Sequence, residues 1–100
     1  MKIVYLENED LENLINKDLV LIDFYADWCG PCKMIAPVLE MVQDQIQIIK
    51  INIDNHENLA SKYGVMSIPT LIFTKDGKEV RRLIGYTDED ELKAVIDELR

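Results

Sequence analysis

A nearly continuous apolar run, Leu19 to Ala26, constrains the fold of this chain more than any other stretch. A strand with one solvated face alternates apolar and polar residues, whereas a strand covered on both faces of a parallel sheet is apolar throughout. Only Asp23 interrupts the run. We therefore predict a central strand over residues 19–26, packed between two layers of helices.

The rest of the chain predicts the other elements of a mixed sheet. Runs of β-type residues predict four more strands, at residues 2–6, 47–54, 71–74 and 79–83. Lys75-Asp76-Gly77-Lys78 is typical of a tight hairpin turn, which would give the sheet an antiparallel edge. Apolar residues at helical spacing predict about four helices, and we place the N-caps of three of them at Asn8, at Asp54 or Asn55, and at Thr87. In the remaining helix, Met34 and Met41 are interpreted as core residues.

Both cysteines follow the central strand directly, in Trp28-Cys29-Gly30-Pro31-Cys32-Lys33, where a helical pattern begins. Side chains three residues apart are neighbours on a helix, so the two thiols can form a local disulfide. Closing so small a loop would stabilise the fold by only roughly 2 kcal/mol, less than a long-range disulfide gives. The pair is therefore better suited to redox chemistry than to a structural role.

The start of the helix distinguishes the two sulfurs. A thiol at a helix N-terminus faces unpaired N–H groups and the positive end of the helix dipole, which lower its pKa. Cys29 comes first, so we predict that Cys29 is the nucleophile and that Cys32, one turn later, is the resolving thiol. Pro31 suits an early helical position, and Gly30 leaves the first sulfur open to a large partner.

Asp23 is a candidate proton acceptor. Alternation along the strand places its side chain on the same face as Leu21 and Tyr25, where burial would raise the pKa of the carboxyl. Composition alone leaves a buried acid and a solvated strand position equally open. Its place shortly before the cysteines favours the buried acid, which would take the proton of Cys32, through a water molecule, when that thiol must become a nucleophile.

Other kinds of site fit the sequence less well. A tetrahedral zinc site needs about four ligands, and the chain has two cysteines and a single histidine, His56, so we expect no metal. The net charge of −8 argues against binding nucleic acid or an anionic membrane. No apolar run approaches the ~20 residues of a membrane span, and Met1 to Glu7 does not have the pattern of a signal peptide.

These features predict a cytoplasmic protein, a compartment in which catalytic disulfides are expected and structural ones are unusual. The 100 residues suit one domain, residues 1–100, and we expect a monomer.

The hexapeptide at 28–33 resembles the active site of the thioredoxin family. The resemblance extends through residues 23–26, 34–37 and 68–70, and through the order of elements over nearly the whole chain. It implies an α/β thioredoxin fold, with a central mixed sheet of about five strands flanked by about four helices. It also implies a protein dithiol–disulfide oxidoreductase that reduces disulfides through a mixed-disulfide intermediate. Its partners would be disulfide-containing target proteins and a separate thioredoxin reductase, linked to NADPH or ferredoxin. The redox-active disulfide Cys29-Cys32 would serve without any bound cofactor.

The resemblance also implies roles for single residues. Asp23 matches the buried aspartate of the family, and Lys50 matches the lysine whose charge lowers the pKa of that acid. The Ile68-Pro69 bond would be cis and would lie beside the cysteines, and Gly85 would line the substrate groove. The implied substrate-binding surface consists of Trp28, Gly30, Pro31, Ile68, Pro69 and Gly85.

Three alternatives stay open at this stage. An oxidase or isomerase would use the same fold, although such proteins usually have histidine before Cys32. A glutathione-dependent glutaredoxin usually has Pro-Tyr between its cysteines, where this chain has Gly30-Pro31. From another class, a redox-controlled binding module would use the disulfide only to gate a partner. Tyr25, often tryptophan in the family, and Ser67, often glycine, depart from the common pattern and bear on the shape of the groove.

Overall fold

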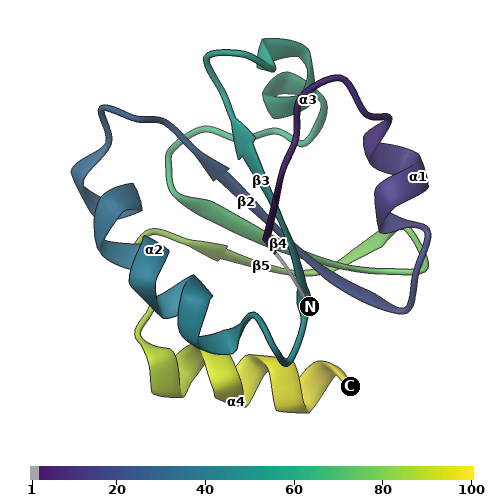
Figure 1. Ribbon diagram of the computed structural model, residues 1–100, viewed down its shortest axis with the longest axis vertical. Coiled ribbons are helices and arrows are strands. Elements are labelled where there is room, and N and C mark those ends of the chain that lie inside the picture. Colours follow the sequence, from purple (N-terminus) through teal and green to yellow (C-terminus); the bar gives the residue numbers. More distant parts are fainter. Residues whose placement is uncertain (1–2) are drawn as a thin grey trace.

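Strand β2 (Leu19–Tyr25) lies in the middle of a five-stranded sheet, as the apolar run predicts (Figure 1). The computed structural model describes residues 3–100. The strand order is β1-β3-β2-β4-β5, with β1, β3 and β2 parallel and with β4 and β5 antiparallel to their neighbours. The remaining strands are β1 (Ile3–Tyr5), β3 (Gln47–Asn52), β4 (Thr70–Lys75) and β5 (Lys78–Ile84). Lys2, predicted to start the first strand, lies outside the described residues.

Helices cover both faces of this sheet, which confirms the predicted layers (Figure 1). Helices α2 (Gly30–Val42) and α4 (Glu89–Leu99) pack on one face, around Leu21, Leu71 and Phe73. Helices α1 (Leu11–Ile15) and α3 (Glu57–Lys62) cover the other. None of the helices formed by residues 3–100 is both long and apolar enough to cross a membrane.

The side chains of β2 divide between these two cores. Val20, Ile22 and Phe24 belong to the cluster under α1 and α3, whereas Leu21 belongs to the cluster under α2 and α4. Asp23 follows the parity of Leu21 and is fully buried, as predicted. In the parallel register of β2 and β3, Asp23 stands opposite Lys50.

The hairpin between β4 and β5 also agrees with the prediction. Asp76 and Gly77 adopt positive φ angles of 53° and 81°, as the two central residues of a type I′ turn do. The twist of this turn matches the right-handed twist of the strands that it joins, so β5 pairs with β4 as an antiparallel edge.

The predicted N-caps were wrong at three helices. Asp10, not Asn8, caps α1, and Asp88, not Thr87, caps α4; each aspartate accepts a backbone N–H of the first helical turn. His56 occupies the N-cap position of α3 without a side-chain hydrogen bond, in place of Asp54 or Asn55. A cap must directly precede the first helical residue, and Thr87 lies one residue too early. The core assignment of the methionines was also wrong, because Met34 and Met41 are each 62% exposed.

Asp88 provides a test of the cap assignment. Its Oδ1 accepts the N–H of Glu91 at 2.8 Å, so Asp88→Ala should lower the free energy of unfolding by about 1 kcal/mol. Asp88→Asn should retain most of the stability because the amide oxygen can accept the same hydrogen bond, and Asp90→Ala removes only a nearby charge. Urea unfolding measures the three variants. An Asp90→Ala loss as large as that of Asp88→Ala would show that charge, not capping, stabilises the helix start.

Candidate active site

Cys29 and Cys32 form a disulfide at the N-terminus of α2, directly beyond the carboxyl end of β2. Cys29 is the N-cap residue, and its Sγ accepts the backbone N–H of Cys32 at 3.1 Å. Pro31 occupies the first turn, where its missing N–H leaves no intrahelical bond unmade. The sequence-predicted geometry of the pair, two sulfurs one turn apart at the start of a helix, is confirmed.

The loop before β4 lies against the disulfide. The Ile68-Pro69 peptide bond is cis, as the resemblance predicted, and the carbonyl oxygen of Ile68 lies 3.7 Å from Sγ of Cys29. The N–H of Gly85 donates to the carbonyl oxygen of Pro69 at 2.8 Å. These contacts bring together three segments that are far apart in the sequence, with Cys29, Pro69 and Gly85 in one connected region.

Exposed side chains surround the disulfide. The cysteines themselves are buried, whereas Gly30 and Pro31 are exposed and Trp28 is 68% exposed, in agreement with its predicted surface role. Nε1 of Trp28 donates to Oδ2 of Asp54 at 3.0 Å, a partner that the sequence did not reveal. Met66, Ile84 and Tyr86 add exposed apolar surface from the segments that flank Pro69 and Gly85. Large exposed apolar side chains in segments next to Pro69 and Gly85 are typical of a binding surface.

Asp23 and Lys50 form a buried pair on the adjacent strands β2 and β3. Nζ of Lys50 lies 3.8 Å from Oδ2 of Asp23, within ion-pair range but too far for a hydrogen bond. Among the described residues, neither carboxylate oxygen of Asp23 has a hydrogen-bond partner. Burial raises the pKa of Asp23 from its ordinary value of 3.8 to about 6, and the charge of Lys50 opposes that shift. At 3.8 Å, Lys50 acts on the carboxylate through electrostatic attraction and not through a hydrogen bond.

A small cavity lies between Lys50 and Cys32 of the disulfide. Its volume is about 220 Å³, and its lining includes Cys32, Lys50, Tyr5 and Tyr25. Cys32 and the lysine that pairs with Asp23 therefore face one common space. The sequence did not indicate that Tyr5, from the edge strand β1, reaches this cavity.

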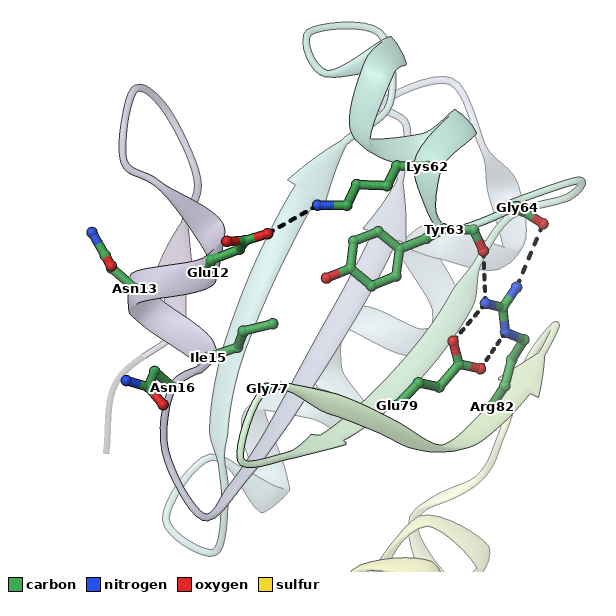
Figure 2. A pocket seen from close by; sticks show the side chains of 10 residues that line it. All are labelled: Glu12, Asn13, Ile15, Asn16, Lys62, Tyr63, Gly64, Gly77, Glu79 and Arg82. Atoms are coloured by element: carbon green, nitrogen blue, oxygen red, sulfur yellow. Dashed lines mark hydrogen bonds and ion pairs between the residues drawn. The ribbon is translucent and has the colours of Figure 1, made fainter.

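A larger pocket lies elsewhere, between α1, α3 and the β4–β5 hairpin (Figure 2). Its volume is about 800 Å³, and neither cysteine lines it. Glu12 pairs with Lys62 across it, and Glu79 pairs with Arg82, so its charged side chains are matched within the chain. Size alone does not make this pocket the reactive site, because the redox chemistry belongs to the disulfide.

Comparison with known proteins agrees with this geometry. The family model for thioredoxin matches residues 2–98. The chain belongs to the thioredoxin family. A thioredoxin from Chlamydia caviae is 50% identical over 101 residues, covering 98% of this chain and 97% of the relative. A thioredoxin from Staphylococcus aureus is 43% identical, with 97% of each chain covered. The solved structure of a mutant thioredoxin from Halobacterium salinarum superposes with a TM-score of 0.91 at 41% identity, covering 98% of this chain and 90% of that one.

The family of this chain indicates the function of its disulfide. Thioredoxins are protein-disulfide oxidoreductases, and Cys29-Cys32 is the redox-active disulfide of this family member. The fold expected from the resemblance, a mixed sheet of five strands with four helices, is confirmed. Within residues 3–100, no three histidine, cysteine or acidic side chains gather as a group that could hold a metal ion.

The raised pKa of Asp23 predicts a pH-dependent stability. An acid whose pKa is higher in the folded state favours folding when protonated, so its contribution falls as pH rises from about 4 through about 6. The difference of about two between the two pKa values corresponds to about 3 kcal/mol in the free energy of unfolding. Removing the Asp23 carboxylate also removes the ion pair of Lys50, which offsets part of the expected gain. Asp23→Asn should therefore raise the free energy of unfolding by about 1–3 kcal/mol at pH 8, and by much less near pH 4.5.

Urea unfolding of the oxidised protein at the two pH values measures this difference. Asp27→Asn is the matched control, because it neutralises an exposed carboxylate just after β2 and should not reproduce the effect. A gain in stability for Asp23→Asn that is equal at both pH values would contradict burial of a titrating carboxyl.

Proposed function

We propose that this member of the thioredoxin family reduces disulfides in other proteins, with Cys29 as the nucleophile. The observation that carries the proposal is the place of Cys29 at the N-cap of α2, where its Sγ accepts the N–H of Cys32 at 3.1 Å. In the reduced state, that N–H and the positive end of the helix dipole favour a thiolate over a thiol. Cys29 is therefore the sulfur that attacks first.

The reaction moves two electrons from the dithiol to the target. Sγ of Cys29 attacks one target sulfur, which forms a mixed disulfide and releases the other target sulfur as a thiolate. Sγ of Cys32 then attacks Sγ of Cys29, breaks the bond to the target and releases its second sulfur. The Cys29–Cys32 disulfide is left behind, so the target is reduced and the cysteine pair is oxidised.

Asp23 serves the second step as the proton acceptor. Cys32 must lose its proton before it attacks, and a carboxyl with a pKa of about 6 is largely ionised near neutral pH. Cys32 lines the same cavity as Lys50, which in turn pairs with Asp23, so water in that cavity would carry the proton. Lys50 keeps the carboxylate available because its charge favours the ionised form.

Target proteins would dock on the exposed surface around the disulfide. An extended target segment pairs with the backbone at Ile68, in the manner of an added strand. Apolar contacts come from the remaining substrate-binding residues, which are Trp28, Gly30, Pro31, Pro69 and Gly85. The 3.7 Å contact between Ile68 and Cys29 supports this arrangement, because a segment paired with residue 68 is held next to the reactive sulfur.

The cycle closes through a separate thioredoxin reductase in the cytoplasm. The protein acts as a monomer with a single domain, and its disulfide carries the electrons without a bound cofactor. Offering NADPH-linked and ferredoxin-linked reductases to the oxidised protein, and measuring the thiols formed, identifies which class supplies the electrons. Reduction by neither class would overturn this assignment of partner.

The assigned roles of the cysteines predict opposite behaviour of two serine variants. Cys32→Ser should accumulate a covalent adduct with a disulfide substrate such as insulin, because the resolving sulfur is gone. Cys29→Ser should form no adduct, and both variants should lose turnover with dithiothreitol. Non-reducing electrophoresis and mass spectrometry detect the adduct. A wild-type protein that binds insulin without turning it over would indicate a redox-controlled binding module instead.

The role of Asp23 predicts a slower second step. Asp23→Asn should slow release of the target from the mixed disulfide by about tenfold or more near neutral pH, because no carboxylate remains to accept the proton of Cys32. Formation of the mixed disulfide should change little. Rapid-mixing measurements separate the two steps, and the control is Asp97→Asn, which removes an exposed carboxylate on α4. Equal rates of target release in Asp23→Asn and the wild type would remove Asp23 from the mechanism.

A further inference from the structure

Two tyrosine rings enclose the ammonium group of Lys50. Its Nζ lies 4.8 Å from the ring centroid of Tyr25 and 5.4 Å from that of Tyr5. The rings meet edge to face, with centroids 6.5 Å apart and an interplanar angle of 84°. Both distances are within the range of a cation–π interaction. Strands β1, β3 and β2 are adjacent in that order, so the three side chains come from three neighbouring strands.

The ammonium group thus lies among aromatic rings and a carboxylate instead of water. Lys50 is only 7% exposed, and it lies 3.8 Å from Asp23. A lysine withdrawn from water needs other groups to replace its hydration, and a ring face does so without neutralising the charge. Burial raises the pKa of Tyr25, so this ring remains a neutral phenol wherever the enzyme is tested near neutral pH.

Tyr5 is more exposed to solvent than Tyr25. Tyr5 is 56% exposed and lies on the edge strand β1, separated from the strand of Asp23 by β3. Its ring therefore stands at the solvent side of Lys50. From there it can restrain the ammonium group and shield it from water, while Asp23 stays buried whether or not the ring is present.

We propose that Tyr5 is a positioning residue for the reduction of the mixed disulfide, and that its ring holds the Lys50 ammonium group against Asp23. The proposal rests on the role of Asp23 and Lys50 put forward above. It adds Tyr5, from strand β1, to Asp23 and Lys50. The Tyr5 ring keeps the charge of Lys50 close to Asp23, the proton acceptor.

Other charged and titratable groups around the pair do not replace Lys50. Besides Lys50 and the two tyrosines, the cavity is lined by three such groups, which are Asp27, Cys32 and Lys33. On the other side of β2, strand β4 places Leu71 opposite Asp23, which adds no charge. Lys50 is the one cation that forms an ion pair with Asp23 within residues 3–100.

The sign of the effect follows from this arrangement. Without the Tyr5 ring, the ammonium group gains water and freedom to move, and its attraction for the Asp23 carboxylate weakens. Asp23 remains as buried as before, so the pKa of Asp23 should rise. The strength of a cation–π contact at a partly exposed site corresponds to a shift of about half a pH unit.

The titration of Asp23 in the oxidised protein tests the link directly. In Tyr5→Ile, which keeps a strand-forming residue, the midpoint followed by carboxyl carbon NMR should rise by about half a unit. Tyr5→Phe keeps the ring and should titrate as the wild type does. Tyr86→Leu removes another half-exposed tyrosine, beyond β5, and should also leave the midpoint unchanged. In a Lys50→Met background, Tyr5→Ile should no longer shift Asp23, because the ring acts through the lysine.

Kinetic measurements distinguish the role proposed for Tyr5 from the role proposed for Asp23, on which it rests. Near pH 6, target release should be about twofold slower in Tyr5→Ile than in the wild type, with the midpoint of its pH profile shifted as in the NMR titration. An unchanged NMR midpoint in Tyr5→Ile, or an equal shift in Tyr5→Phe, would overturn the role of the Tyr5 ring. A shifted NMR midpoint with an unchanged kinetic profile would instead overturn Asp23 as the proton acceptor.

Discussion

Burial of β2 on both faces is the constraint on which the rest of this structure depends. Helices cover each side of the strand, and the chain passes from β2 into α2 through residues 26–29 alone. That short passage places Cys29 at the N-cap of the helix. The same burial places Asp23 in a dry interior, where a carboxyl is protonated more readily than in water. Both chemical features of the site, a sulfur at a helix start and an acid of raised pKa, are therefore consequences of one fully covered strand.

The role proposed for Asp23 conflicts with its contribution to stability. An apolar residue at this position would continue the core of Leu21 and Leu71 without the cost of burying a charge. Lys50 offsets that cost only in part, because the pair is separated by 3.8 Å and the carboxylate has no hydrogen-bond partner among the described residues. A tighter pair would hold the acid ionised and make it a poorer base. The separation therefore leaves Asp23 with a pKa of about 6, a value suited to the proton exchange that we propose for it.

Local patterns predicted those parts of the molecule that depend on neighbours in sequence. The apolar run of β2, the Asp76-Gly77 turn, the parity of Asp23 and the helix start at the cysteines were all predicted from a few adjacent residues. The N-caps were predicted at the wrong residues because several residues that can cap a helix lie within a few positions of each helix N-terminus. The places of Lys50, Pro69 and Gly85 beside the site were expected only by resemblance to a family, since they are set by tertiary contacts. Tyr5 and the Trp28–Asp54 hydrogen bond were missed for the same reason: their partners lie 45 and 26 residues away.

The two sulfurs of the disulfide lie in different environments, and in the proposed mechanism this difference sets the order of the two attacks. Cys29 contacts the loop before β4 at Ile68 and has a backbone N–H directed at its sulfur, so the proposed mechanism activates it without a side-chain base. Cys32 lines the inner cavity with Lys50, and the base proposed for it, Asp23, lies on the sheet. In the proposed mechanism the first attack depends on the helix, whereas the second depends on β1, β2 and β3 through Tyr5, Asp23 and Lys50. Changes to the strand residues should therefore alter how fast a target is released while leaving its capture intact, because capture requires only the end of α2 and the loop before β4.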